Sequence, residues 1–254
     1  IGLPNVGKST IFNALTSSSI PAENYPFCTI EPHMGIVPLP DPRLEVLEKI
    51  YSPEKVTPAN VEFTDIAGLV KGASKGEGLG NQFLGQIRQV DAIIHVVRCF
   101  EGENISHVEE SIDPIRDIEL IETELLLADL STMDKALKRL EKLSRSDKKM
   151  GADFELVKKL KIFCDEGNSA RNFSCNESES NFIKSMFLLT AKPIMYLANI
   201  NEGELMTNSP GKFSESLLAK FSEDETEVIR LCGKVEQEIS TLDSGEQLEY
   251  LSEY

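Results

Sequence analysis

The sequence has no apolar run that approaches the roughly 18 residues of a membrane-spanning helix. It has no signal peptide ahead of its first motif, and no Cys-x-x-Cys pair occurs among its five cysteines. We therefore expect a cytoplasmic protein without membrane association, whose cysteines are free thiols in a reducing compartment. No cluster of cysteine and histidine has the spacing of metal ligands, so we expect no metal site of that type.

Basic residues are scarce relative to acidic ones: 26 lysines and arginines stand against 42 aspartates and glutamates, a net charge of −16. The molecule as a whole is therefore not expected to bind nucleic acid by bulk attraction. One segment differs, because residues 134–161 hold ten basic residues against five acidic ones, a local balance of +5.

The strongest motif opens the chain. Residues Gly2 to Ser9 (Gly-Leu-Pro-Asn-Val-Gly-Lys-Ser) fill the Walker A pattern of a phosphate-binding loop, or P-loop. The glycines permit the backbone angles that turn successive N–H groups toward α- and β-phosphates. Lys8 is expected to reach the β- and γ-phosphates, and the Ser9 hydroxyl to bind Mg²⁺. The nucleotide-binding positions predicted here are Asn5, Val6, Gly7, Lys8, Ser9 and Thr10.

A helix is predicted to begin at Lys8, with Ile11, Phe12 and Leu15 on one buried face. A P-loop normally follows a buried strand, but only Ile1 precedes Gly2. Either the numbering begins inside that strand or the strand is missing from the chain.

The rest of the chain alternates strands and helices around one long helical segment. That segment begins at Asp113-Pro114, and its leucine and methionine spacing is that of a coiled-coil seam (Leu126, Leu130, Met133, Leu137, Leu140). Strands are predicted at 34–39, 61–64, 92–97, 194–198 and 227–232; helices after Asp41-Pro42, at 79–90, from 114 to about 144, and at 154–165, 178–189, 213–221, 235–241 and 246–252. We therefore predict an α/β P-loop NTPase fold with a mostly parallel sheet, formed by residues 1–114 and 191–254, and an α-helical coiled-coil insertion at 115–190.

A second phosphate-binding signal is Asp65-Ile66-Ala67-Gly68 at the end of the 61–64 strand. Asp65 is expected to hold Mg²⁺ through water, and the Gly68 N–H to meet the γ-phosphate. Thr29 is either a switch threonine that joins Mg²⁺ or a plain loop residue. Ras-like enzymes orient water with a glutamine directly after this motif, where this chain has Leu69. Unassisted hydrolysis should therefore be slow, on the order of 10⁻⁴ to 10⁻² s⁻¹.

Base recognition is expected from the loop after the 194–198 strand. The usual guanine-reading motif, Asn-Lys-x-Asp, occurs nowhere in the chain, and Asn199-Ile200-Asn201-Glu202 stands in its place. This change argues against guanine. A second register, from Asn201 to Glu204, is possible, but Asn199 directly ends the strand.

These motifs together resemble the YchF/Obg-like ATPase family over essentially the whole chain. The residues that carry the resemblance are Gly2 to Thr10, Asn24 to Pro32, Asp41 to Leu44, Asp65 to Asn81 and Asn199 to Glu202. The resemblance implies a P-loop NTPase that prefers ATP, carries a coiled-coil insertion and associates with ribosomes. It also implies a C-terminal TGS domain, which the chain ending at Tyr254 does not include. The chain departs from the family at Cys232-Gly233-Lys234, which stands in place of the small Ser-Ala-Lys-type loop that lies beside the base.

We therefore expect an ATP-hydrolysing molecular switch that acts as a monomer. The alternatives are a GTPase whose altered base loop still accepts guanine, and a nucleotide-gated scaffold that scarcely turns over. In related P-loops an asparagine at the position of Asn5 helps to hold a K⁺ ion in place of an arginine finger; a plain turn residue is the other interpretation. The basic helical segment is either a solvated coiled-coil face or a contact for ribosomal RNA.

Overall fold

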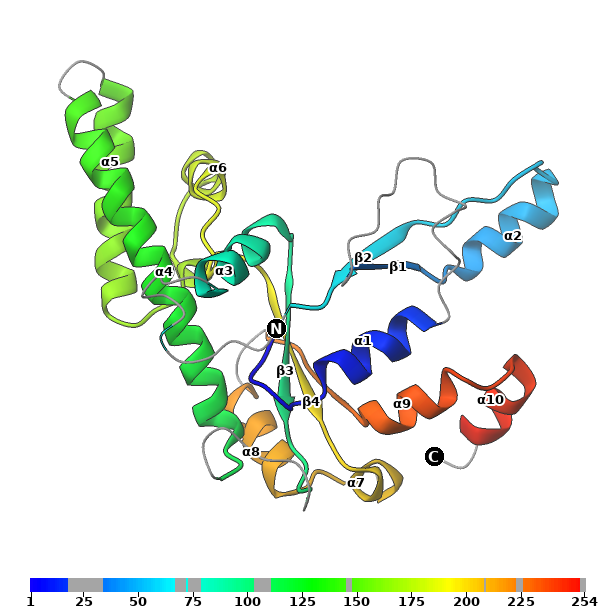
Figure 1. Cartoon of the computed structure of the whole chain (residues 1–254). Helices are drawn as coiled ribbons and strands as arrows, with labels where there is room; N and C mark the ends of the chain where they lie inside the picture. The colour runs from blue at the N-terminus through cyan, green and yellow to red at the C-terminus, as the bar shows by residue number, and fades with distance from the viewer. Residues whose placement is uncertain are drawn as a thin grey trace. The chain divides into compact units, whose positions relative to one another are not determined.

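The computed structural model describes residues 1–17, 34–66, 72, 79–102, 111–144, 148–207, 209–222 and 226–251. The chain forms two compact units. The first comprises Ile1–Val6, Ala67–Asn199 and Pro210–Arg230, and the second comprises Gly7–Ile66, Ile200–Ser209 and Leu231–Tyr254. Figure 1 shows both units, with labels on most of their helices and strands.

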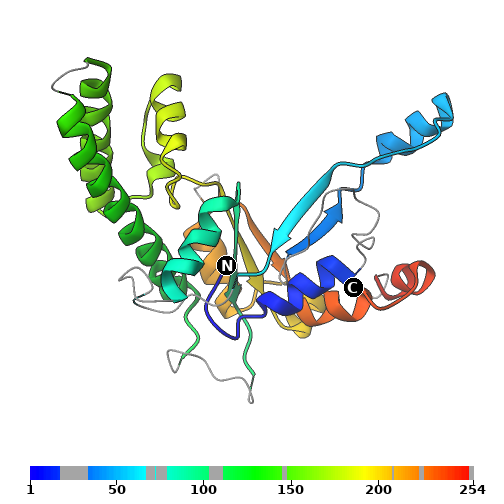
Figure 2. The same cartoon turned by 45° about the horizontal axis from the view of Figure 1, so that its top comes forward.

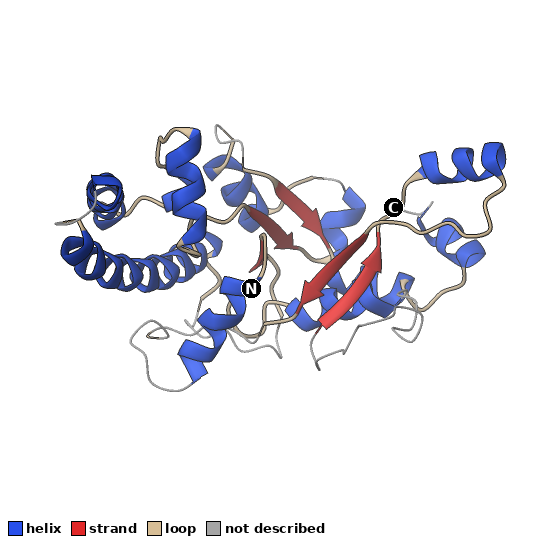
Figure 3. Ribbon diagram, turned by 90° about the horizontal axis from the view of Figure 1, so that it is seen from above, coloured by secondary structure: helices blue, strands red, loops and turns tan. Residues whose placement is uncertain are grey.

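A three-stranded sheet with the order β3-β4-β5 is the centre of the first unit (Figure 3). Its strands are β3 (Ile93–Arg98), β4 (Ile194–Asn199) and β5 (Val228–Leu231). β3 and β4 are parallel, in a register that pairs Ile93 with Ile194 and Arg98 with Asn199. Ile1 lies beside β3: its amino group donates to the Ile94 carbonyl at 2.7 Å, and its carbonyl accepts from the Val96 N–H at 2.9 Å. This is the bond pattern of a parallel pair, so the residue before the P-loop runs alongside β3.

β3 and most of β4 are buried, as expected where helices cover both faces of a parallel sheet, whereas β5 is partly exposed, with Ile229 37% exposed. His95 and Val97 are each 1% exposed, and Tyr196 and Ala198 are 1% and 0% exposed. The helices of this unit outside the insertion are α3 (Leu79–Gln89) and α8 (Lys212–Lys220).

The insertion contains two long helices that lie side by side, α4 (Pro114–Leu143) and α5 (Lys148–Asp165) (Figures 1 and 2). Asp113 caps α4 by accepting the Arg116 N–H at 3.1 Å, and Pro114 occupies the first turn. The predicted seam is confirmed, because Met133 and Leu140 are buried against Val157 and Leu160 of α5, and Leu126, Leu130 and Leu137 pack on the same cluster. The chain then forms the short η3 (Ala170–Asn172) and α6 (Glu177–Ser185), which begins with an Asn176/Glu179 capping box.

The second unit contains α1 (Lys8–Ser17), β1 (Met34–Pro38), α2 (Pro42–Tyr51), β2 (Asn60–Thr64), α7 (Glu202–Thr207), α9 (Gly233–Ile239) and α10 (Ser244–Leu251). β1 and β2 pair antiparallel, with Met34 opposite Thr64. α1 packs against α9 and against β1. At Gly35 a Cβ would lie 2.1 Å from the Thr16 methyl, so glycine is what lets β1 lie this close to α1.

The predicted fold class, α/β with parallel strands and a long helical insertion, is confirmed, while several details of the prediction are wrong. Leu15 is 39% exposed and does not share the buried face of Ile11. Leu44, Leu47 and Ile50 of α2 lie on one face by their spacing, but no residue of this helix is buried. α5 begins six residues earlier than predicted, α6 ends four residues earlier, and α7 was not predicted.

Candidate nucleotide-binding site

The P-loop is shaped by three residues with positive φ: Gly2 at 152°, Asn5 at 62° and Gly7 at 97°. Asparagine is one of the few side chains that adopt this region readily, so the residue at position 5 suits a turn. A Cβ at Gly2 would lie 2.4 Å from the Val96 carbonyl oxygen, so no larger residue fits there without moving the backbone. Leu3 and Val6, 2% and 1% exposed, anchor the loop by burial.

Helix α1 starts directly after this turn, because the Gly7 carbonyl accepts the Ile11 N–H at 3.0 Å. A helix N-terminus carries unpaired N–H groups and a partial positive charge, which together suit a phosphate group. Thr10 is half-buried in the first turn of this helix. The predicted combination of tight turn and helix is therefore present.

Lys8, Ser9 and Asp65 are brought together within the second unit. The Ser9 hydroxyl, on α1, donates to Oδ2 of Asp65, the residue that follows β2, at 2.7 Å. Burial lowers the pKa of the Lys8 ammonium, and the nearby Asp65 carboxylate opposes this shift. A further negative group near such an amine favours its charged form. A phosphate beside Lys8 would have this effect.

The Ser9 and Asp65 oxygens also fit Mg²⁺. Both are hard oxygen donors of the type this ion prefers. The Ser9 hydroxyl lies 2.7 Å from Oδ2 of Asp65, so an ion bound to Ser9 would be near enough for Asp65 to hold it through water.

Asn199 ends β4 and contacts the P-loop within the first unit. Its side-chain N–H donates to the Val6 carbonyl at 2.9 Å, and the side chain is only 5% exposed. Its own carbonyl accepts the Cys99 N–H at 2.8 Å, which fixes the end of β4 to the residue after β3. The sequence indicated Asn199 as a base-reading residue but did not predict that it also holds the P-loop.

The residues after Asn199 belong to the second unit. The Ile200 N–H donates to the Leu231 carbonyl at 2.9 Å, and Ile200 is 2% exposed. The Asn201 side chain accepts the Glu204 N–H at 2.8 Å and so caps the start of α7. Glu202, the first residue of α7, lies 3.7 Å from the Lys234 ammonium, which also lies 3.7 Å from Glu238.

Cys232 and Gly233 are buried at the start of α9, with Cys232 as the N-cap residue. α9 packs on α1, so these two residues lie at the start of the helix that contacts the P-loop helix. The remaining predicted site residues, Thr29, Gly68 and Leu69, lie outside the described residues.

Comparison with known proteins decides the family. The profile of the 50S ribosome-binding GTPase family matches residues 1–149. The ribosome-binding ATPase YchF of Bacillus subtilis is 48% identical over all 254 residues, which correspond to 69% of that protein. The proteins of the same name from Haemophilus influenzae and Escherichia coli O157:H7 are 48% and 46% identical over the same shares. This chain belongs to the YchF family of P-loop NTPases.

A solved YchF structure supports the same assignment. The Schizosaccharomyces pombe YchF GTPase superposes with a TM-score of 0.85 at 35% identity, covering 99% of this chain and 69% of that one. The names of these relatives differ on the nucleotide, since the bacterial proteins are called ATPases and the yeast protein a GTPase. Family membership therefore establishes the P-loop NTPase chemistry and leaves the base to be argued from residues.

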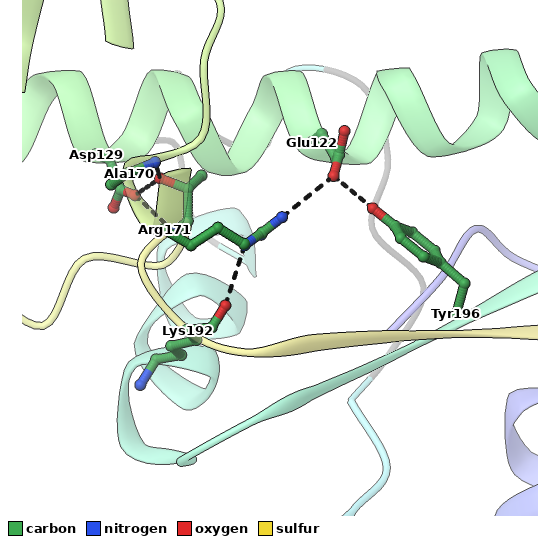
Figure 4. Close-up of polar contacts among 7 residues, drawn as sticks. Glu122, Asp129, Ala170, Arg171, Lys192 and Tyr196 are labelled. Carbon is green, nitrogen blue, oxygen red and sulfur yellow. Dashed lines mark hydrogen bonds and ion pairs between the residues drawn. The ribbon is translucent and has the colours of Figure 1, made fainter. Parts of the chain in front are cut away.

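In this YchF family member, α4 is joined to the sheet of the first unit by a network that sequence reasoning missed (Figure 4). Tyr196, three residues before Asn199 on β4, donates its hydroxyl to Glu122 of α4 at 2.5 Å. Arg171 of η3 lies 3.6 Å from the same carboxylate oxygen and donates to the Lys192 carbonyl at 3.2 Å. Burial, with the Glu122 charge, raises the pKa of Tyr196, so the phenol stays protonated and serves as a donor.

Two other kinds of site are absent from the described part of the chain. None of the helices described there is long and apolar enough to cross a membrane. Nor do the described residues gather three or more His, Cys, Asp or Glu side chains in a metal-binding group.

Proposed function

We propose that this chain binds ATP with Mg²⁺, hydrolyses it slowly and acts as a ribosome-associated switch in the cytoplasm. The observation that carries the proposal is the contact of Ser9 with Asp65 at 2.7 Å beside Lys8, whose pKa burial lowers. Relatives that span the whole chain are named ribosome-binding ATPases. When bound, Mg²⁺ would neutralise developing charge on the phosphates.

The proposed roles follow the two phosphate motifs. Backbone N–H groups of the P-loop bind the phosphates, and Lys8 reaches the β- and γ-phosphates. Ser9 binds Mg²⁺ directly, Asp65 holds it through water, and the Thr29 hydroxyl joins it. The nucleotide-binding set is Asn5, Val6, Gly7, Lys8, Ser9, Thr10, Asn199, Ile200, Glu202, Cys232 and Gly233.

We assign ATP rather than GTP because the loop after β4 lacks Asn-Lys-x-Asp. Guanine presents N1–H and 2-amino donors to the aspartate of that motif, whereas adenine offers only its 6-amino donor. Glu202 is longer than aspartate and lies within 3.7 Å of the Lys234 ammonium, so part of its negative charge is already balanced. A carboxylate that is partly neutralised discriminates less strongly for the two guanine donors.

Competition binding tests the nucleotide. A fluorescent ATP analogue bound to the full chain with Mg²⁺ should be displaced by ATP at concentrations about tenfold below those of GTP, a difference of about 1.4 kcal/mol. The Ser9→Ala variant should lose most of the Mg²⁺ dependence. Tighter binding of GTP than of ATP would replace this proposal with the GTPase alternative.

A matched pair of variants tests the base-reading residue. Glu202 and Glu238 each lie 3.7 Å from Lys234, but only Glu202 follows the nucleotide-binding strand β4. We expect Glu202→Gln to change the ratio of ATP to GTP affinity and Glu238→Gln to leave it unchanged. Equal effects of the two variants would mean that the affinity ratio depends on the charge balance at Lys234 and not on base reading by Glu202.

Hydrolysis should be slow because the position after Gly68 is Leu69, which has neither a donor nor an acceptor to orient water. We propose that a partner completes the catalytic site, and that Asn5 helps to hold a K⁺ ion. Single-turnover hydrolysis at tens per second without a partner would contradict the first idea. Equal rates in K⁺ and Na⁺ buffers would contradict the second. Intact ATP that persists in purified complexes would instead favour a scaffold with little turnover.

The α4–α5 hairpin is the proposed contact with ribosomal RNA. Six of its basic side chains are exposed, while the seam between the helices is buried or partly buried, so these six are available to a polyanion. The exposed set is Lys135, Lys138, Arg139, Lys142, Lys158 and Lys159. We propose that the protein acts as a monomer.

A further inference from the structure

Glu124 occupies an unusual place on α4, because it lies on the buried face of the helix. The buried positions there include Ile121, Glu124, Leu125 and Ala128, at helical spacing, and Glu124 is 6% exposed. Acidic side chains are rarely buried unless they are hydrogen-bonded, since removing a carboxylate from water is costly. Its buried position therefore calls for a specific partner.

Gly72 supplies a hydrogen bond to this carboxylate. Its backbone N–H donates to Oε1 of Glu124 at 2.7 Å, across 52 residues of sequence and within the first unit. The distance is short for an N–H donor, as expected of a bond to a charged acceptor. The bond therefore attaches the backbone at Gly72 to the rigid first half of α4.

Glycine is needed at position 72 for its backbone conformation. The φ angle is +90°, which other residues rarely adopt, while a Cβ built there has nothing within 4 Å. An alanine would therefore meet no steric obstacle but would disfavour the conformation that directs the N–H toward Glu124.

Gly72 follows Gly68 of the Asp65-Ile66-Ala67-Gly68 motif by four residues. Four residues span at most about 14 Å even when fully extended, so chain length alone ties Gly72 closely to this motif. In P-loop NTPases the chain after this motif contributes to γ-phosphate binding and to the orientation of water.

We propose that Glu124 is a positioning residue for ATP hydrolysis, which holds the chain after the Asp65–Gly68 motif through the N–H of Gly72. The proposal rests on the ATPase function proposed above. The same helix continues into the basic hairpin, so one rigid element both fixes this chain segment and presents the surface proposed for RNA.

Four variants of the full chain test the assignment: Glu124→Ala, Glu124→Gln, Gly72→Ala and the double variant Glu124→Ala/Gly72→Ala. We expect Glu124→Ala and Gly72→Ala each to lower kcat by about tenfold, with ATP affinity unchanged within about twofold. Glu124→Gln should restore most of the rate because its amide oxygen can still accept the N–H. The double variant should be no slower than either single one, because both remove the same contact.

The Gly72 amide resonance gives a readout that is independent of turnover. In ¹⁵N-labelled protein it should move strongly in Glu124→Ala and stay in place in Glu141→Ala, a control at an exposed acid of the same helix. A melting temperature measured on every variant separates a general loss of stability from loss of positioning.

Two results would overturn the positioning role: an unmoved Gly72 resonance in Glu124→Ala, or rate losses that add in the double variant. Unchanged kcat in a folded Glu124→Ala protein would overturn it as well. If the unaltered chain hydrolyses no Mg²⁺-ATP, the ATPase function itself fails; normal turnover with either result above removes only the role of Glu124.

Discussion

A side chain at position 2 has no room, because a Cβ there lies 2.4 Å from the Val96 carbonyl oxygen on β3. The obstacle is backbone in a buried strand, which cannot move aside as a flexible side chain could. The φ angle of 152° adds a conformational cost for any residue other than glycine. Gly2 therefore couples the position of the P-loop to the sheet.

The Gly2→Ala variant is predicted to lose at least about 2 kcal/mol of unfolding free energy, with loss of ATP binding. Gly85→Ala is the matched control, since Gly85 lies within α3 and a Cβ there meets nothing within 4 Å. That change should stabilise the protein by about 0.5 to 1 kcal/mol. Urea unfolding and nucleotide titration of both variants check the prediction; similar losses in both would contradict it.

Asp129 shows how a buried acid fastens the insertion. Its carboxylate is 0% exposed and accepts three hydrogen bonds, from the N–H groups of Leu189 and Thr190 and from the Thr190 hydroxyl, at 2.7 to 2.8 Å. Burial raises the pKa of Asp129, and these donors oppose the shift. The carboxylate thus binds α4 to the segment that leads into β4.

The raised pKa of Asp129 predicts a definite pH dependence. A carboxyl whose pKa is higher in the folded state takes up a proton on folding, so its contribution to stability is greatest below about pH 4 and falls as the pH rises through the folded pKa. Asp129→Asn should destabilise the protein by roughly 1 to 3 kcal/mol and should lack this dependence. The free-energy difference between the two proteins should therefore shrink from pH 4 upward in urea unfolding experiments. A free-energy difference that grows with pH would mean that the pKa of Asp129 is lowered, not raised, in the folded protein.

Helix α4 connects the sheet of the first unit to the helical hairpin, and its two halves pack against different elements. Near its start, Ile118, Ile121 and Leu125 are fully buried and α4 packs on β3, while its later part pairs with α5. The proposed division into residues 1–114 with 191–254 and an insertion at 115–190 places both halves in the insertion. The burial indicates that the first half also supports the sheet.

Two deletions test this division. Removing residues 138–156 and joining the cut ends with a short glycine-serine turn should leave a folded protein with normal ATP binding, because only the distal hairpin is removed. Removing all of 115–190 should prevent folding, since each buried Ile or Leu typically contributes 2 to 5 kcal/mol, as a rough range. Circular dichroism melting and ATP titration distinguish the two. A stable, ATP-binding product of the larger deletion would establish the insertion as a separate domain.

Elements with local signals were predictable from sequence, and elements that depend on distant partners were not. Asp113-Pro114 and Asp41-Pro42 marked the starts of α4 and α2 because capping is local chemistry. The six residues of α7 are too few to show a helical period. The exposed Leu47 and Ile50 of α2 show that periodicity defines a face but not whether anything covers it.

The same distinction applies to the candidate site. The Walker A pattern and the Asp-x-x-Gly motif predicted that Ser9 and Asp65 act together, because each motif has a fixed place in the fold. The bond of Asn199 to Val6 spans 193 residues and follows only from the register of β4 beside the P-loop. Glu124 offered one signal, an acid within the apolar stripe of a helix, but nothing in the sequence identified Gly72 as its partner.

At the scale of the whole molecule, the basic α4–α5 hairpin differs in charge from the rest of the chain, which is strongly acidic. At physiological salt both the repulsion from the net charge of −16 and the attraction of the hairpin act only within about one Debye length, roughly 8 Å, so the charge nearest the contact decides. Binding to RNA should therefore be local, oriented and sensitive to salt.

Replacing Lys158 and Lys159 with Glu should weaken ribosome binding and make it less sensitive to salt. The slope of log K against log salt concentration should become shallower by about 0.7 to 0.9 for each lysine–phosphate pair removed. Reversing Lys184 and Lys212, exposed lysines outside the hairpin, changes the net charge equally and should have little effect. Sedimentation with ribosomes at several salt concentrations measures both. Equal weakening by the two pairs would show that overall charge, not the hairpin, controls binding.

Because α4 is long, a small change in its direction near Glu124 would move its far end by a much larger distance. From Glu124 to the end of the helix at Leu143 there are nineteen residues, a span of about 28 Å. A tilt of only about 5° at Glu124 would move the far end by about 2.5 Å, slightly less than the length of a typical hydrogen bond. A small change of direction at Glu124 would thus be amplified at the tip of the hairpin, the surface proposed for RNA.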